Sequence, residues 1–404
     1  MMNKLMNRIK ISAHFGWEIV KYALLCPIGK LLYGRKNVWL ISERGTDARD
    51  NGYHFFRYMR KKHPEVESVF VISKDSPDRS RVAALGRVVD YRSIRHYMLF
   101  FGAQYLISTH LMGYAPNCDF YKYIQAKMKK KVVGGKSVFL QHGITKDNMV
   151  NLYQEKTKLD LFICGAKPEY MYISQNWHYQ HGEVCYTGFA RFDALADYQT
   201  KRQILMMPTW RNWLEYGVDA CEKNTMESSF FRHWKSLLNN SRLLELANEY
   251  NVQFVFYPHY RVQKYLSAFS TASSEIILAD FAHYDVQQLL KESMLLITDY
   301  SSVYFDFAYM KKPVLYYQFD EEEYRAKHYA QGYYDYRRDG FGEVVNDEQE
   351  LLDLLEHYLS DGCRLKPEYQ KRIEGFFPLH DNQNCERIYQ AILAEKNRWV
   401  DEHV

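Results

Sequence analysis

Two adjacent serines in the second half of the chain follow a short apolar run, in a pattern suited to holding a phosphate group. Residues 294–297 are apolar enough for a buried parallel strand, and Asp299, Ser301 and Ser302 come where a helix should begin. The first backbone N–H groups of a helix are unpaired and partly positive, so hydroxyls beside them form a cradle for phosphate. We expect Asp299 to cap this helix rather than to bind metal. An ordinary capped helix in an α/β domain is the alternative interpretation.

Further clusters of polar side chains each follow an apolar stretch, at residues 139–143, 188–193, 207–211 and 256–261. In open α/β sheets, ligands bind beyond the carboxyl ends of the strands. Clusters that lie far apart in the sequence can therefore converge on one crevice. The residue types, histidine, arginine and hydroxyl groups, are those that phosphoryl chemistry uses.

Alternating strands and helices are expected to position these clusters. At 404 residues the chain is too long for one core and suits two domains, each with a parallel sheet. The boundary is expected near residues 193–203. Candidate strands of the first domain are residues 38–42, 69–72, 105–108, 138–141, 161–164 and 184–187. Those of the second are residues 204–207, 253–257, 276–278, 295–298, 314–316 and 343–345.

The clusters together resemble, in composition and order, the motifs of the CDP-glycerol glycerophosphotransferase family, which includes teichoic-acid primases and polymerases and capsule-synthesis relatives. The matching segments are His142-Gly143, residues 208–211, Pro258-His259 and residues 298–302. The resemblance extends over residues 37–395 and is specific because several motifs occur together.

Two departures from the family pattern bear on which acceptor and which polyol the protein would use, and not on the class of reaction. Gln141 stands where many teichoic-acid members have tryptophan, and Lys146 follows at a different spacing from their lysines. In a further stretch, Ala190 replaces the family's proline between Gly188 and Arg191.

The resemblance implies an α/β fold with two Rossmann-like domains facing across a cleft, the GT-B architecture. The expected division is residues 1–36 as an amphipathic segment, 37–195 as the acceptor-side domain, 196–375 as the nucleotide-donor domain and 376–404 as a helix bracing both domains. Arg191 and Asp193 are expected to pair with each other at the hinge.

The resemblance also implies a transferase that moves glycerol phosphate, or another polyol phosphate, from CDP-glycerol or CDP-ribitol to a hydroxyl of a lipid-linked glycan or polymer, releasing CMP. Teichoic acid or capsule synthesis would be the setting. No cofactor is expected, since the CDP-polyol is a co-substrate and no paired-carboxylate motif requires Mg²⁺. A GT-B glycosyltransferase that uses a nucleotide sugar and a non-catalytic membrane-bound scaffold are the alternatives. The polyol, the acceptor, the extent of polymerisation and self-association stay open.

Candidate roles follow from the chemistry of the side chains. His142 is the expected general base, because an imidazole with a pKa near 6.5 is largely neutral yet basic at cytosolic pH. His259 would donate a proton to a phosphate oxygen or to the leaving group, and Arg211 offers a planar fork for the diphosphate. The remaining expected substrate contacts are Gly143, Thr209, Asp299, Ser301 and Ser302.

The first 36 residues resemble a membrane-surface helix. Apolar residues recur at helical spacing among many basic ones, namely Met6, Ile9, Ala13, Trp17, Val20 and Leu24. The apolar run at residues 22–29 is far shorter than the ~20 residues that span a bilayer. We therefore expect a peripheral protein on the cytoplasmic face of an anionic membrane. Packing of this helix on its own domain is the alternative.

Composition fits an intracellular enzyme. The cysteines are odd in number, scattered and without a metal-binding spacing, which favours reduced thiols over disulfides. The net charge of +4 is too small to indicate nucleic-acid binding.

Overall fold

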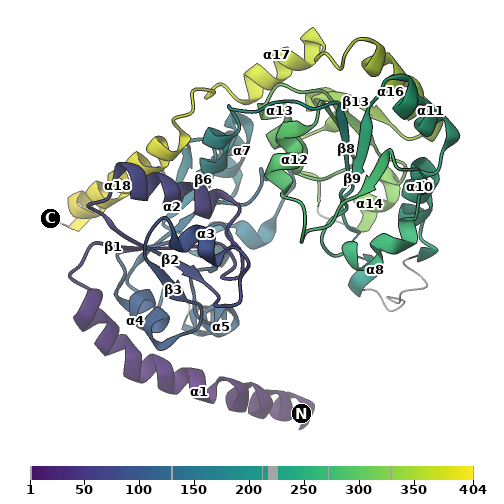
Figure 1. Cartoon of the computed structure of the whole chain (residues 1–404). Coiled ribbons are helices and arrows are strands. Elements are labelled where there is room, and N and C mark those ends of the chain that lie inside the picture. Colours follow the sequence, from purple (N-terminus) through teal and green to yellow (C-terminus); the bar gives the residue numbers. More distant parts are fainter. Residues whose placement is uncertain are drawn as a thin grey trace. The chain divides into compact units, whose positions relative to one another are not determined.

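The computed structural model consists of two α/β units (Figure 1). Its backbone is described for residues 2–128, 131–211, 213–216, 226–271, 273–327 and 330–403. Unit 1 comprises Met1–His142, Val150–Ala194 and Asp381–Val404. Unit 2 comprises Gly143–Met149 and Leu195–His380.

Unit 1 contains a parallel sheet with the strand order β3-β2-β1-β4-β5-β6-β7. The strands are β1 (Val38–Ser42), β2 (Glu67–Ile72), β3 (Val88–Asp90), β4 (Tyr105–Ser108), β5 (Lys136–Phe139), β6 (Leu161–Cys164) and β7 (Val184–Tyr186). The chain order reverses between β1 and β4, which makes their carboxyl ends the topological switch point where such sheets bind ligands.

Helices cover both faces of this sheet (Figure 1). The helices are α1 (Met2–Tyr33), α2 (Asn51–Lys62), α3 (Arg79–Ala83), α4 (Ile94–Gly102), α5 (Cys118–Met128), α6 (Gln154–Thr157), α7 (Lys167–Asn176) and α18 (Asn384–His403), with 3₁₀ turns η1 (Val150–Leu152) and η2 (Ala190–Ala194). Val38 and Leu40 of β1 share a core with Phe100 of α4. Trp39, on the opposite face, packs near Phe55 of α2 and Tyr389 of α18. Burial on both faces explains why the first four residues of β1 are all apolar.

Unit 2 contains a second parallel sheet with the order β10-β9-β8-β11-β12-β13. The strands are β8 (Gln203–Met207), β9 (Gln253–Phe256), β10 (Ile276–Leu278), β11 (Leu295–Thr298), β12 (Val314–Tyr317) and β13 (Gly342–Val345). The helices are α8 (Trp213–Tyr216), α10 (Ser229–Leu238), α11 (Ser241–Glu249), α12 (Val286–Glu292), α13 (Val303–Tyr309), α14 (Glu321–Lys327), α15 (Tyr336–Asp339), α16 (Glu348–Ser360) and α17 (Pro367–Phe376), with the 3₁₀ turn η3 (Gln263–Phe269). The switch point lies between β8 and β11.

The expected fold class is confirmed, since both units are α/β with parallel sheets. The division of the chain differs in two places from the one expected. Residues 143–149 belong with unit 2, although the expected first domain contained them. The C-terminal helix α18 belongs with unit 1, where it contacts α2, β6 and η2.

Helix α1 packs on unit 1 along one face and exposes apolar residues on another. Tyr22 lies against Phe101 and Phe120, with ring centroids 4.8 Å away in each case. A Cβ at Gly29 would lie 2.4 Å from the Met98 carbonyl oxygen, so glycine permits the close approach to α4. The packing on its own domain that the sequence left as the alternative is therefore observed for this face.

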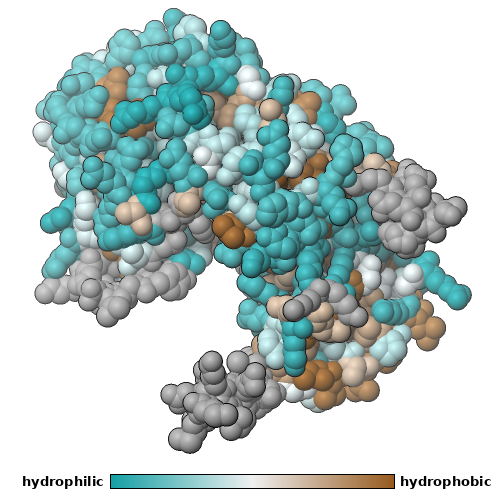
Figure 2. Space-filling model, turned by 180° about the vertical axis from the view of Figure 1, so that it is seen from behind, coloured by the Kyte–Doolittle hydropathy of each residue, from teal (hydrophilic) through white to brown (hydrophobic). Residues whose placement is uncertain are grey.

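The opposite face of α1 carries an exposed apolar stripe, formed by Trp17, Val20, Leu24, Ile28 and Leu31. We call these five residues the α1 stripe. Figure 2 shows hydrophobic residues gathered over this helix. The side chains of Met6, Ile9 and Ala13, which the sequence also placed on this face, lie outside the described residues. No helix in the described part of the chain is long and apolar enough to cross a membrane.

Candidate active site

His142 lies at the switch-point edge of unit 1, two residues beyond the buried Leu140 that follows β5. Its ring stacks on His110, which follows β4, with centroids 4.5 Å apart and planes 10° apart. His142 Nδ1 lies 3.4 Å from the Thr109 carbonyl oxygen. A carbonyl only accepts hydrogen bonds, so this contact assigns the proton to Nδ1 and leaves Nε2 with a free lone pair. That is the form a general base needs.

Burial favours the neutral form of both histidines. Burial lowers the pKa of His110 to about 2, and His142 and Arg44 act in the same direction. Desolvation also lowers the pKa of His142, while the Asp50 carboxylate opposes this shift. Because the His142 side chain still exposes surface to water, solvent offsets part of the desolvation.

Gln141 fixes the backbone immediately before His142. It adopts a left-handed conformation with φ of 57°, which is uncommon for a residue other than glycine. Its Nε2 donates to the Ile163 carbonyl at 2.7 Å and to Glu169 Oε1 at 3.1 Å. Asn51 Nδ2 donates to the Gln141 carbonyl at 2.8 Å. The residue that replaces the family tryptophan thus holds the candidate base in place.

Arg191 and Asp193 do not pair as the sequence suggested. Arg191 Nη1 instead lies 2.8 Å from Asp50 Oδ1, beside the histidine pair. Asp193 accepts hydrogen bonds from the backbone N–H groups of Asn384 and Cys385, at 2.9 and 2.8 Å, where α18 begins. Each residue has a positioning role, but in a different contact from the expected one.

In unit 2, Asp299 ties together the carboxyl ends of β8 and β11. It accepts from Thr209 N at 2.8 Å and from Tyr300 N at 2.5 Å. The expectation that Asp299 caps the following helix was wrong, because the N-cap residue of α13 is Ser302. Asp299 lies completely buried and so shapes the edge of the sheet.

Arg211 is also completely buried, in contrast with the expected fork for a diphosphate. Its Nε and Nη2 donate to the two oxygens of Asp320 at 2.8 and 3.0 Å, and Nη1 lies 2.8 Å from Asp299 Oδ2. Nη1 also donates to the Thr209 carbonyl at 2.7 Å. With its donors committed to these partners and no accessible surface, Arg211 is placed to organise the β8 edge and not to meet a phosphate directly.

Ser301 and Ser302 are half-buried at the same edge. A Cβ at Gly143 would lie 2.7 Å from Ser302 Oγ, so the absence of a side chain allows this approach. Gly143 directly follows His142 in the chain.

His259 follows β9, the neighbour of β8, and is half-buried. The backbone N–H of Arg261 donates to His259 Nδ1 at 3.4 Å. In the neutral ring this contact assigns the proton to Nε2, which makes Nε2 a donor. This tautomer fits the donor role expected for His259.

Sequence reasoning missed several residues that build these edges. His110 could have been found, because it lies two residues beyond an expected strand, and His142 likewise comes directly after one. No sequence pattern indicated Asp320 or Asp147. Asp320 pairs with Arg211, 109 positions away, and Asp147 pairs with Arg325, 178 positions away. No three His, Cys, Asp or Glu side chains among the described residues are arranged to hold a metal ion.

Comparison with known proteins identifies similar sequences over most of the chain. Residues 28–394 match the family described as CDP-Glycerol:Poly(glycerophosphate) glycerophosphotransferase. The chain is 35% identical over 381 residues to the minor teichoic acid biosynthesis protein GgaB of Bacillus subtilis (strain 168), covering 91% of this chain and 41% of GgaB. It is 24% identical to the teichoic acid poly(glycerol phosphate) polymerase of the same organism, covering 89% and 49%. The chain thus spans less than half the length of these relatives.

Solved structures share the fold. The wall teichoic acid polymerase TagF superposes with a TM-score of 0.68 at 18% identity, covering 97% of this chain and 99% of that one. UDP-GlcNAc 2-epimerase from Neisseria meningitidis bound to UDP-GlcNAc gives a TM-score of 0.52 at 12% identity, covering 88% and 99%.

Proposed function

Because the chain belongs to the CDP-glycerol:poly(glycerophosphate) glycerophosphotransferase family, we propose that it moves glycerol phosphate, or another polyol phosphate, from a CDP-polyol to a hydroxyl of a lipid-linked glycan or polymer. CDP-glycerol and CDP-ribitol are the candidate donors. Teichoic acid or capsule synthesis is the proposed setting, in keeping with the names of the relatives. The observation that carries this proposal is the His142 ring, neutral and with Nδ1 directed at a carbonyl.

The proposed reaction is an in-line displacement at phosphorus. The acceptor oxygen attacks the outer phosphorus of the CDP-polyol, and the P–O bond to CMP breaks. The hydroxyl proton passes to His142 Nε2. His259 Nε2–H donates to a phosphate oxygen or to the departing CMP, where negative charge develops. The tautomers assigned above support both roles.

The donor phosphates are proposed to bind at the β8–β11 edge of unit 2, against Ser301, Ser302, Gly143 and Thr209. Arg211 and Asp299 act as positioning residues there. Their mutual ion pair holds the β8 end beside the β11 end, which sets the place of Thr209 and of the serines. We propose no resident cofactor, because the phosphoryl transfer described needs only the acid, the base and these donors.

We further propose that the protein associates peripherally with the cytoplasmic face of an anionic membrane through the α1 stripe. Lys30 is exposed on the same helix, so basic and apolar contacts would act together. Such an anchor would hold the enzyme near a lipid-linked acceptor.

A screen of donors tests the proposed activity. Purified full-length protein with an acceptor is incubated with CDP-glycerol, CDP-ribitol and a panel of UDP-sugars, and the released nucleotide is quantified. Consumption of a CDP-polyol supports the phosphotransferase. Consumption of a UDP-sugar alone would replace it with the glycosyltransferase alternative, and consumption of no donor with any acceptor would favour the scaffold.

A further inference from the structure

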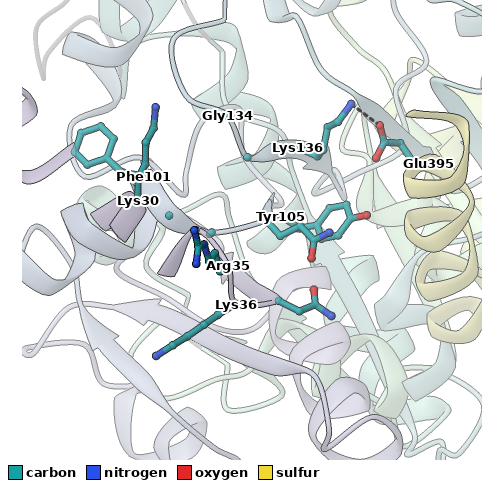
Figure 3. Close-up of a pocket in the computed structure, with 14 residues that line it drawn as sticks. Lys30, Arg35, Lys36, Phe101, Tyr105, Gly134, Lys136 and Glu395 are labelled. Atoms are coloured by element: carbon teal, nitrogen blue, oxygen red, sulfur yellow. Dashed lines mark ion pairs between the residues drawn. The ribbon is translucent and has the colours of Figure 1, made fainter. Parts of the chain in front are cut away.

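A cavity lies at the end of the unit 1 sheet where the strands begin (Figure 3). Its volume is about 590 Å³. Asn37, Gln104 and Lys136 line it where β1, β4 and β5 begin, whereas His142 follows the other end of β5. The last turn of α1, the loop after it and α18 form the remaining wall. The cavity is therefore separate from the candidate active site.

The cavity carries an excess of positive charge. Lys30, Arg35 and Lys36 come from α1 and the loop that follows it, and all three side chains are exposed. Within the part of the chain that the structure describes, these three have no ion-pair partner. Figure 3 marks an ion pair for Lys136 but none for these three residues. An anion would find uncompensated cationic groups here.

Glu395, from α18, adds an unused acceptor. Its side chain is paired with Lys136 through Oε1 at 2.9 Å. The residue is only 6% exposed, and its Oε2 is buried without a hydrogen-bond partner among the described residues. A buried carboxylate oxygen without a donor is costly, so a ligand that brings a hydroxyl group into the cavity would be favoured if the Glu395 side chain turned to present Oε2 to it.

Glycine opens the wall beside these groups. Gly134 has no heavy atom within 4 Å of where its Cβ would lie, so space remains next to its backbone. A Cβ at Gly135 would lie 2.6 Å from the Ala103 carbonyl oxygen, so this close approach requires glycine. This part of the cavity wall is thus bare backbone. Beside it lie the Glu395 carboxylate and the side chains of Lys30, Arg35 and Lys36, which we call the cationic rim.

We propose that this cavity binds a phosphate ester that also carries hydroxyl groups, with Lys30, Arg35 and Lys36 contacting the phosphate and Glu395 Oε2 accepting from a hydroxyl. The ligand class is a polyol phosphate. It can come from the headgroup of a glycerophospholipid or from a free polyol phosphate. The inference rests on the cavity and not on the proposed transferase activity.

The position of the cavity makes a lipid headgroup accessible. Leu31, the last residue of the α1 stripe, is 82% exposed and directly follows Lys30. If the α1 stripe inserted into a bilayer, the lipid headgroups would contact the cationic rim at the C-terminal end of α1.

The test compares the full-length protein with two variants of equal charge. Lys30→Gln/Arg35→Gln/Lys36→Gln removes the rim. Lys61→Gln/Lys62→Gln/Lys167→Gln removes three exposed basic residues of unit 1 that do not line the cavity. The probes are glycerol 3-phosphate and inorganic phosphate, measured by calorimetry, and phosphatidylcholine vesicles with equal molar fractions of phosphatidylglycerol or phosphatidylserine, measured by sedimentation.

The rim variant is expected to lose about tenfold or more in affinity for glycerol 3-phosphate, while the control variant keeps the wild-type affinity.

If binding is instead seen only with phosphatidylglycerol vesicles, above binding to phosphatidylserine, and is lost in the rim variant, the source is the lipid headgroup. Equal losses in both variants would overturn the proposal, since general charge would then explain binding. Equal affinity for inorganic phosphate and glycerol 3-phosphate would overturn the polyol assignment. Both variants should keep wild-type turnover with a soluble acceptor, so this test stands apart from the test of the active site.

Discussion

At the residue scale, His142 should be the side chain on which turnover depends most. His142→Ala removes a positioned base, so we expect kcat to fall by roughly 10² to 10⁴-fold while donor affinity changes little. Steady-state kinetics with a separate measurement of CDP-glycerol affinity checks this. His178→Ala is the control, since His178 is an exposed histidine of the same unit. Near-normal turnover in the His142 variant would remove this residue from the role of base.

The pH profile should reflect the environment of His142. Its pKa is lowered, and the base works only when deprotonated, so the acid limb of kcat/KM should fall below about pH 6.5. Asp50 raises the pKa of His142, so Asp50→Asn should move this limb to still lower pH. A limb that moves upward in the variant would contradict the assignment.

Arg211 should matter first for stability. Arg211→Met leaves Asp299 and Asp320 buried without their cation, which should cost about 3–5 kcal/mol in the free energy of unfolding. Denaturant unfolding of the variant and the wild type measures this. A variant that keeps native stability but loses affinity for CDP would instead support the expected role of Arg211 as a planar fork for the diphosphate.

The sequence could locate polar residues at strand ends but not their partners. His142 and His259 follow apolar runs, and that pattern is visible without a structure. The partner of Arg211 is not, because Asp320 lies 109 positions away and the chain offers 49 acidic residues. Long-range ion pairs depend on the packing of the whole unit, so Arg211 was interpreted as free when it is buried and paired.

At the element scale, apolar strands were predicted well, and one strand was missed. The bounds of β1, β4 and β10 agree with the sequence, because buried parallel strands leave a continuous apolar run. Strand β3 was missed, since only two of the three residues in Val88–Asp90 are apolar. Helix α1 needed the structure, because its sequence alone does not say which apolar face is buried.

The α1 stripe should drive membrane binding. Leu24→Glu/Leu31→Glu places charge on residues that are 62% and 82% exposed, so the fold should persist while sedimentation with anionic vesicles decreases. Higher salt should release part of the wild-type protein, because screening weakens the basic contribution. Val150→Glu/Met171→Glu, on exposed apolar residues of the same unit, serves as the control. Equal vesicle binding by both double variants would show that the stripe has no such role.

At the scale of the whole molecule, each unit carries one part of the proposed chemistry. Unit 1 holds His142 at its switch-point edge, and unit 2 holds Ser301 and Ser302 at its own. The sequence predicted the division near Ala194 but not the transfer of residues 143–149 to unit 2. That segment joins unit 2 through an isolated bridge from Asn148 to Ala330, which no local pattern reveals.

The identity of the nucleotide released from CDP-glycerol tests the central claim most directly. Attack of the acceptor on the outer phosphorus releases CMP, whereas attack on carbon releases CDP. We predict CMP in a one-to-one ratio with new phosphodiester bonds, with both lost in His142→Ala. Release of CDP, or formation of the phosphodiester at an unchanged rate without His142, would contradict the account.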